Sequence, residues 1–312
     1  MENSIKFQRL NQPLWQLLLR AGFTLLRRRR EFGAPRQFQH ELPAPSLHAI
    51  GAYQQHFAYP AAAVPLCFYY PLLQRAQLAG MLQCPGLAVA GLIHTDNMLH
   101  SLQGQTPAQL CAAGPLQIST VLSTECNAQG RYLLAEQQLW QQGKLLIQAS
   151  SRYLINKAPR TTAPTAPAAP IAATAVASIT PLADAARRYA KLSGDYNPIH
   201  LWQWSARLFG QRQVILHGMA TAAMLCQVLT TTSPVPNQPA WLQTLQLRFR
   251  KPVLPGTTLT ITQQADGHYQ LHDGARLCLE AELKFSDAAP HNDTVSHNDT
   301  VSHSDAPGHD TP

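Results

Sequence analysis

The chain has 312 residues, of which 45% are hydrophobic and 13% are charged. This composition excludes global disorder, because it provides enough apolar surface for a sizeable core in one large domain or two ordinary ones. The formal net charge is +7, but the one dense basic run, Arg27 to Arg30, has no interleaved aromatic residues, which argues against nucleic acid as a partner.

The six cysteines include no C-x-x-C pair and no metal-ligand spacing. We interpret them as free thiols of a cytoplasmic protein, and we predict no metal and no cofactor. Residues 1–36 carry eight basic side chains against two glutamates, and residues 286–312 carry five aspartates with no lysine or arginine. The mild positive charge left in the middle of the chain suits a phosphate-carrying ligand, such as coenzyme A or an acyl carrier protein.

Residues 1–41 are predicted to be an N-terminal amphipathic basic helix and its lead-in. Polar residues recur at helical spacing along one face of 14–26, and the predicted apolar face holds Leu14, Leu18, Leu19, Phe23 and Leu26. Gln16 and Arg20 interrupt the segment, which is too short to span a membrane. Two interpretations stay open: a helix packed on its own protein, or a peripheral contact with anionic lipid through residues 14–30.

Residues 42–156 read as a helix followed by strands. A helix is predicted over 69–82, and the apolar run from Leu87 to His94 is predicted to be a buried strand. Alternating apolar and polar residues then predict an antiparallel meander with strands at 116–123, 131–141 and 144–153. His94 is interpreted either as a buried histidine with its polar atoms satisfied or as a residue that lines a pocket.

Residues 157–178 contain four prolines among alanine and threonine, a composition typical of an extended linker. Residues 179–286 repeat the element order of the first half: a helix at 181–191, a strongly apolar helix at 218–229, and four strands within 241–285. Two similar halves predict an α+β duplication. The polar repeats of 287–312 cannot bury a core and are predicted to be disordered.

Chemistry-bearing residues gather in the loop before Pro198. Pro198 suits the first position of a helix and Asn197 suits its N-cap, so His200 falls in the first turn and Asp195 in the loop that leads into it. A carboxylate and an imidazole on one rigid corner can converge on one ligand. A histidine with a pKa near neutrality serves proton transfer.

A second pair, His217 and Gly218, opens the long apolar helix. The first N–H groups of a helix lack intrahelical partners, and glycine lets a ligand approach them closely. The Gly218 N–H is therefore predicted to donate to a thioester oxygen and to stabilise enolate charge.

These residues carry a resemblance to a known family. Tyr189 with the run Ser193-Gly194-Asp195-Tyr196-Asn197-Pro198-Ile199-His200, followed by Ala206, Gly210 and Ile215-Leu216-His217-Gly218-Met219, resembles the signature of type-2 (R-specific) enoyl thioester hydratases and MaoC-like dehydratases. The resemblance covers roughly residues 180–285. The first half of the chain resembles the degenerate first domain of this family only loosely, through Tyr53 and the segment that ends at His94.

The resemblance implies a double hot-dog fold, in which each long helix is wrapped by an antiparallel sheet. The halves would be a degenerate hot dog at 42–156 and a catalytic hot dog at 179–286, in a monomeric pseudo-dimer or a homodimer. Implied roles are catalysis for Asp195, His200 and Gly218, and positioning of water or substrate for Asn197, Ser193 and His217. Gln211 stands where an aromatic residue commonly follows the glycine at the position of Gly210, and this difference affects the expected shape of the pocket.

The implied reaction is reversible hydration of trans-2-enoyl thioesters, carried by coenzyme A or acyl carrier protein, to (3R)-3-hydroxyacyl thioesters. A hot-dog thioesterase is one alternative, although the spacing of Asp195, Asn197 and His200 favours hydration. The other alternative is an acyl-thioester binding protein without catalysis. Such a protein needs no acid/base pair.

Overall fold

The computed structural model describes residues 7–26, 33–158, 174–231, 241–265 and 267–286. The arginine run at 27–30, residues 159–173 of the predicted linker and the tail at 287–312 lie outside the described residues. Among the helices that are described, none is long and apolar enough to cross a membrane.

The elements of the first half, in chain order, are β1 (Gln8–Arg9), α1 (Leu14–Gly22), η1 (Phe23–Leu26), β2 (Arg36–Leu42), α2 (Leu47–Phe57), η2 (Leu66–Phe68), α3 (Tyr69–Leu82), η3 (Val89–Gly91), β3 (Ile93–Ser101), α4 (Pro107–Ala112), β4 (Leu116–Asn127), β5 (Gly130–Gln141) and β6 (Lys144–Lys157). Those of the second half are β7 (Thr174–Ile179), α5 (Ala185–Ser193), η4 (Pro198–His200), α6 (Gln203–Leu208), α7 (Gly218–Thr231), β8 (Trp241–Phe249), β9 (Leu259–Ala265), β10 (His268–Asp273) and β11 (Arg276–Ser286). The predicted meander and the four C-terminal strands are confirmed.

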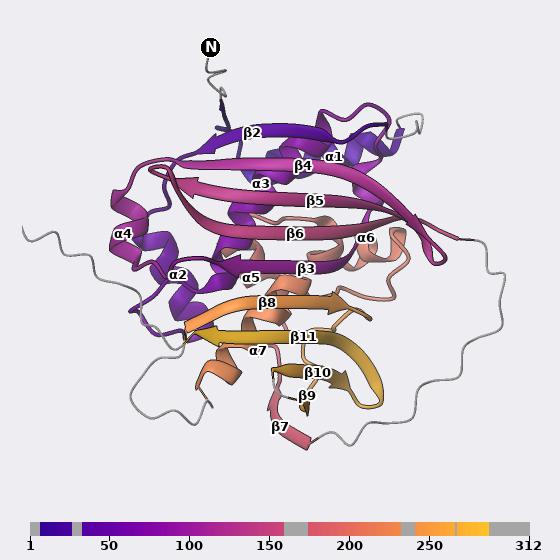
Figure 1. The fold of residues 1–312 in the computed structure, drawn as a ribbon. Coiled ribbons are helices and arrows are strands. Elements are labelled where there is room, and N and C mark those ends of the chain that lie inside the picture. The colour runs from indigo at the N-terminus through magenta and orange to yellow at the C-terminus, as the bar shows by residue number, and fades with distance from the viewer. Residues whose placement is uncertain (1–6, 27–32, 159–173, 232–240, 266, 287–312) are drawn as a thin grey trace, which may run out of the picture.

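The described strands form one sheet in the order β1-β2-β4-β5-β6-β3-β8-β11-β10-β9-β7 (Figure 1). The first six belong to the first half and the last five to the second. The halves join where β3 pairs antiparallel with β8, from Asp96 opposite Arg248 to His100 opposite Thr244. One continuous sheet therefore depends on both halves of the chain.

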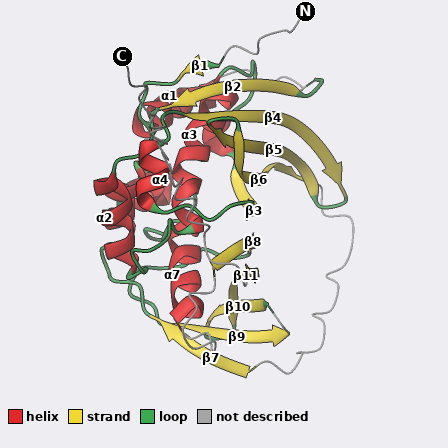
Figure 2. Ribbon diagram, turned by 60° about the vertical axis from the view of Figure 1, so that its left-hand side comes forward, coloured by secondary structure: helices red, strands yellow, loops and turns green. Residues whose placement is uncertain are grey.

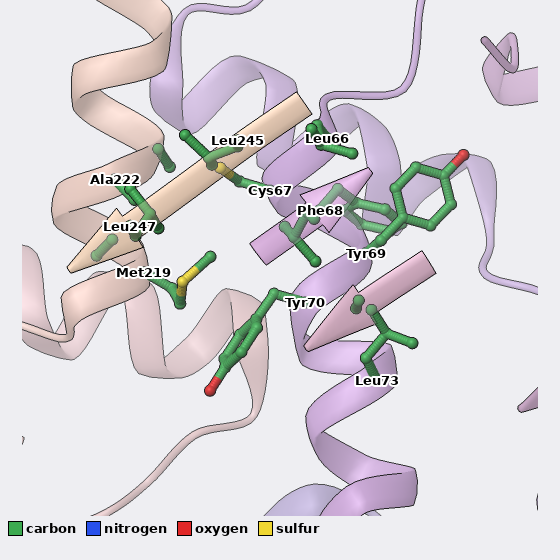
Figure 3. Close-up of a cluster of buried hydrophobic side chains, with 14 of the residues drawn as sticks. Leu66, Cys67, Phe68, Tyr69, Tyr70, Leu73, Met219, Ala222, Leu245 and Leu247 are labelled. Carbon is green, nitrogen blue, oxygen red and sulfur yellow. The ribbon is translucent and has the colours of Figure 1, made fainter. Parts of the chain in front are cut away.

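The helices gather on one face of this sheet (Figure 2). Helices α3 and α7 carry apolar residues all round and are buried along most of their length, as expected of helices enclosed by a sheet. The core passes from one half to the other without a break: Figure 3 shows Leu66 to Leu73 of the first half in one cluster with Met219, Ala222, Leu245 and Leu247 of the second. The Tyr59 hydroxyl also donates across the halves, to the Ala223 carbonyl at 2.7 Å.

The apolar face predicted for α1 is wrong in part, since Leu14 and Leu18 pack on the core but Leu19 and Phe23 do not. Helix α1 packs on α3 through Leu14, Leu17 and Ala21, which are buried, whereas Leu19 and Phe23 are 60% and 74% exposed. The spacing of Leu14, Leu17 and Ala21 is that of a narrow helical stripe. Because a run of leucines fits more than one such stripe, the hydrophobic pattern alone does not determine which face of α1 is buried.

The strand predicted from Leu87 to His94 is also wrong over most of its length. Residues 89–91 form the 3-10 turn η3, and β3 begins only at Ile93. The Val89 N–H donates to the Thr24 hydroxyl at 2.8 Å, so the N-terminal segment satisfies this backbone group. Short apolar runs do not distinguish strands from other buried segments.

Three predicted boundaries are shifted. Strand β2 extends across the boundary predicted at residue 41. Strand β7 includes residues 174–178 of the predicted linker, because alanine and threonine can form an edge strand when a neighbouring strand, here β9, supplies the hydrogen bonds. Helix α5 begins at Ala185, four residues after the predicted start.

Candidate active site

The loop that carries Asp195 begins at the end of α5. Gly194 has φ +74°, the left-handed conformation that ends many helices, and its N–H donates to the Ala190 carbonyl at 2.9 Å. Ser193 shapes the next turn, because its hydroxyl donates to Tyr189 O at 2.8 Å and accepts from the Asp195 N–H at 3.1 Å. These bonds fix the direction in which Asp195 leaves the backbone.

The Asp195 side chain is buried, and both carboxylate oxygens accept hydrogen bonds. Oδ1 accepts from the Asn197 backbone N–H at 3.2 Å, and Oδ2 accepts from Gln74 Nε2 at 2.9 Å. Gln74 belongs to α3 in the first half. The site predicted from the second half alone is therefore completed by the first.

Asn197 caps η4 as predicted: its side-chain oxygen accepts from the Ile199 N–H at 3.5 Å, and Pro198 is the first residue of the turn. The turn places the buried His200 ring so that Nδ1 lies 2.9 Å from the Ile215 carbonyl oxygen. Because a carbonyl only accepts, Nδ1 carries the proton in neutral His200. The other nitrogen, Nε2, is then the one that can take a proton from a ligand.

The His217 ring stacks on the His200 ring, with centroids 3.7 Å apart and planes at 27°. Its Nε2 lies 2.9 Å from the Asp195 backbone carbonyl and therefore donates to it. Its Nδ1 is buried and has no hydrogen-bond partner among the described residues. His217 thus connects the start of α7 with both halves of the predicted catalytic pair.

Burial and the charges of neighbouring residues shift the pKa values of Asp195, His200 and His217. Burial disfavours the Asp195 carboxylate, but His217, His200 and the two hydrogen bonds outweigh it, and the pKa of Asp195 lies below its usual value. Burial, reinforced by His217, lowers the pKa of His200 to about 3, so the pKa near neutrality expected from the sequence is wrong. Burial also lowers the pKa of His217. At neutral pH the site holds an ionised carboxylate beside two neutral imidazoles.

Gly218 begins α7, at the edge of this group. The N–H groups of Ala220 and Thr221 already donate to the His217 carbonyl at 3.1 Å, whereas the first N–H groups of a helix remain free for a ligand. A Cβ at Gly218 would lie 2.6 Å from the Phe249 ring. The glycine is thus required by Phe249 packing, a reason that the sequence did not reveal.

Behind Phe249 lies an aromatic wall from the first half, formed by the buried Tyr70 and the half-buried His94 and Tyr153. The His94 ring is 4.6 Å from that of Tyr153, 4.9 Å from that of Phe249 and 5.8 Å from that of Tyr70. Its Nδ1 is 3.5 Å from the Tyr70 hydroxyl, and its Nε2 has no partner within the described part of the chain. Burial lowers the pKa of His94 to about 4. His94 is thus packed among aromatic rings, a position that both interpretations of it require.

Sequence patterns could not identify Gln74, Tyr70 and Tyr153 as neighbours of the site. Gln74 lies 121 residues from Asp195 in the chain, and all three belong to segments that read as ordinary core. Within the described residues, no group of three or more His, Cys, Asp or Glu side chains could hold a metal ion.

The fold is a double hot dog, in which one chain supplies both halves. Residues 157–284 match the family model of the MaoC like domain. The structure resembles the crystal structure of HtdX from Mycobacterium tuberculosis, with a TM-score of 0.61 and 22% identity over 80% of this chain and 100% of that one. It also resembles full-length peroxisomal multifunctional enzyme type 2 from Drosophila melanogaster, with a TM-score of 0.59 and 19% identity over 80% of this chain and 48% of that one. At these identities the likeness shows the fold.

Sequence similarity is higher over shorter segments. The chain is 40% identical to 3-hydroxyacyl-thioester dehydratase X of Mycobacterium tuberculosis over 86 residues, which are 27% of this chain and 29% of that protein. It is 37% identical to peroxisomal multifunctional enzyme type 2 of Drosophila melanogaster over 78 residues, 25% of this chain and 13% of that one. The matched segments thus span less than a third of either relative.

Proposed function

We propose that the protein is an (R)-specific enoyl thioester hydratase and 3-hydroxyacyl dehydratase, acting on acyl groups carried by coenzyme A or acyl carrier protein. One observation carries the proposal. An ionised Asp195 and a neutral His200 with Nε2 unprotonated are buried near the N-terminus of α7, which begins at Gly218. A relative named as a 3-hydroxyacyl-thioester dehydratase supports the same class of reaction.

In the hydration direction, water oxygen bonds to C3 of the enoyl thioester and a proton reaches C2. At rest neither Asp195 nor His200 Nε2 carries a proton, so one of the pair takes the proton that water loses as its oxygen bonds to C3. That proton is then delivered from the pair to C2, and both groups end unprotonated as they began. Electron density moves to the thioester oxygen, where the Gly218 N–H and the positive end of α7 stabilise the enolate. The reverse sequence removes water.

The remaining residues position this pair. His217 holds the Asp195 backbone and stacks on His200, Ser193 shapes the loop, and Asn197 fixes the turn and orients water. The first half supplies Gln74 to the carboxylate and the aromatic wall to the acyl pocket. One chain thus provides both hot dogs of the pseudo-dimer, and no cofactor enters the proposed reaction.

We expect Asp195→Asn and His200→Ala each to lower kcat by about 10²–10⁴-fold, because each removes one of two proton acceptors. The measurement is hydration of crotonyl-CoA followed at the enoyl absorbance, with thermal unfolding as a check that both variants are folded. Thiol release from saturated acyl-CoA is assayed beside it. Parent-like hydration by both variants, or thiol release faster than hydration in the parent, would contradict the proposal.

A further inference from the structure

Exposed apolar side chains gather at one end of the molecule. Trp15 and Leu19 of α1 are 44% and 60% exposed, and Phe23 at the start of η1 is 74% exposed. They follow one another at four-residue spacing, so they form a stripe on the face that does not pack on α3. A stripe of this size on a short helix is unusual in a fully solvated surface and indicates a binding face.

A second apolar patch lies in the segment 196–209, next to catalytic His200. Trp204 and Leu208 are 67% and 74% exposed on the same face of α6, and Tyr196, Trp202 and Phe209 are exposed as well. The rings of Trp202 and Trp204 stack at 6.2 Å. We call the α1 stripe and this patch together the aromatic rim.

Both elements that carry the aromatic rim are anchored near the catalytic loop. A Cβ on Gly194 would lie 3.6 Å from the Leu14 Cβ, so the first turn of α1 touches the loop that carries Asp195. On α3, Gln74 holds the Asp195 carboxylate while its neighbour Arg75 donates to the Gln12 carbonyl at 2.6 Å. Figure 1 places α1 and α6 at the same end of the sheet, opposite α2 and α4.

The sequence segments that contain the aromatic rim carry basic residues and few acidic ones. The sequence contains no Asp or Glu from residue 3 to 30 or from 196 to 217, whereas these segments carry nine Lys and Arg residues in all. Arg207 and Arg212 are exposed and form no ion pair within the described residues. Arg20 binds the neutral Gln12 side chain at 3.0 Å. Arg20, Arg207 and Arg212 are therefore available to an anionic partner.

We propose that the aromatic rim binds the surface of an anionic phospholipid bilayer, with the catalytic loop facing the lipid. Tryptophan and tyrosine favour the interface between headgroups and acyl chains, and arginine beside them attracts anionic headgroups. An acidic carrier protein would match the charge but has no need of so much exposed aliphatic and aromatic surface. The inference rests on exposed residues only, so it stands or falls separately from the proposed reaction.

The test is flotation of the full-length protein with vesicles of phosphatidylcholine alone and of phosphatidylcholine with phosphatidylglycerol at 3:1. We expect binding to the anionic vesicles, weakened by added NaCl. Leu19→Glu/Phe23→Glu and Trp204→Glu/Leu208→Glu should each lower the vesicle partition coefficient about tenfold, because each pair inserts charge into the lipid-facing surface. Hydration of crotonyl-CoA in solution should remain unchanged.

The matched control is Leu47→Glu, a residue that is 58% exposed on α2, at the other end of the molecule. It should bind vesicles like the parent. Absence of vesicle binding by the parent, or parent-like binding by both paired variants, would overturn the proposal. So would a parent that stays off vesicles but is dimeric in solution and becomes monomeric in the paired variants, which would assign the aromatic rim to a second copy of the chain.

Discussion

Gln74 is the residue through which the first half of the chain contacts the Asp195 carboxylate. Its amide donates to Asp195 Oδ2 at 2.9 Å, and this bond helps hold the pKa of Asp195 below its usual value, after the larger effects of His217 and His200. A depressed carboxyl pKa means that the ionised form is present above that value and is lost as the pH falls through it. The hydrogen bond thus extends the active range towards acid.

Replacing Gln74 with leucine should raise the pKa of Asp195. The acid limb of kcat/KM then moves to higher pH, and kcat/KM at neutral pH falls by about tenfold, because a hydrogen bond to a charged group is lost. The measurement is kcat/KM for crotonyl-CoA from pH 4.5 to 8. Gln77→Leu on the same buried helix is the control, since Gln77 accepts from the Tyr153 hydroxyl at 3.3 Å instead. An unmoved acid limb in Gln74→Leu would assign the residue a packing role only.

The two long helices illustrate what local pattern can and cannot predict. Helix α3 has the predicted limits and α7 has the predicted start. A mostly apolar segment of that length is too long for a typical strand, so the sequence predicts a buried helix without an alternative. The Asp195–His200 corner was predicted from caps and a proline within a few residues. Gln74 and the aromatic wall were not, because their contacts with the second half form only when both halves pack. The strand predicted over 87–92 does not form, because the Val89 N–H donates to the hydroxyl of Thr24, far away in the sequence, and not to a neighbouring strand.

At the scale of elements, α7 and β8 meet where Phe249 lies against Gly218. Gly218→Ala alone should cost about 1–3 kcal/mol of folding free energy, since its Cβ would lie 2.6 Å from the Phe249 ring, and kcat should fall as the start of α7 shifts. Gly218→Ala with Phe249→Leu should recover most of both, because the backbone N–H is kept. Thermal unfolding and kcat report the two quantities. A folded double variant that stays as inactive as Gly218→Ala would show that the ligand itself needs the space at Cα.

At the scale of the whole molecule, the two halves share more than a sheet edge. On the outer face, Asp96 of β3 contacts Arg248 of β8 at 3.1 Å, and Arg248 also contacts Glu280 of β11. These exposed ion pairs contribute little individually. The larger effects are the apolar cluster common to both halves and the bond from Gln74 to Asp195. We therefore expect the proposed activity to require both hot dogs.

A chain limited to residues 171–286 should accordingly fail as an enzyme, although it holds Asp195, His200 and Gly218. Removing the first half exposes the edge of β8 and the apolar face that packs on residues 66–73, and it deprives Asp195 of Gln74. We expect the fragment to be insoluble or to pair with itself. Any residual hydration should be lost first on long acyl chains, because the aromatic wall of the acyl pocket is missing. Solution mass and hydration of short and long enoyl-CoA substrates test this, with the full-length protein assayed in parallel. A stable monomeric fragment with full activity on long chains would refute the dependence of the site on both halves.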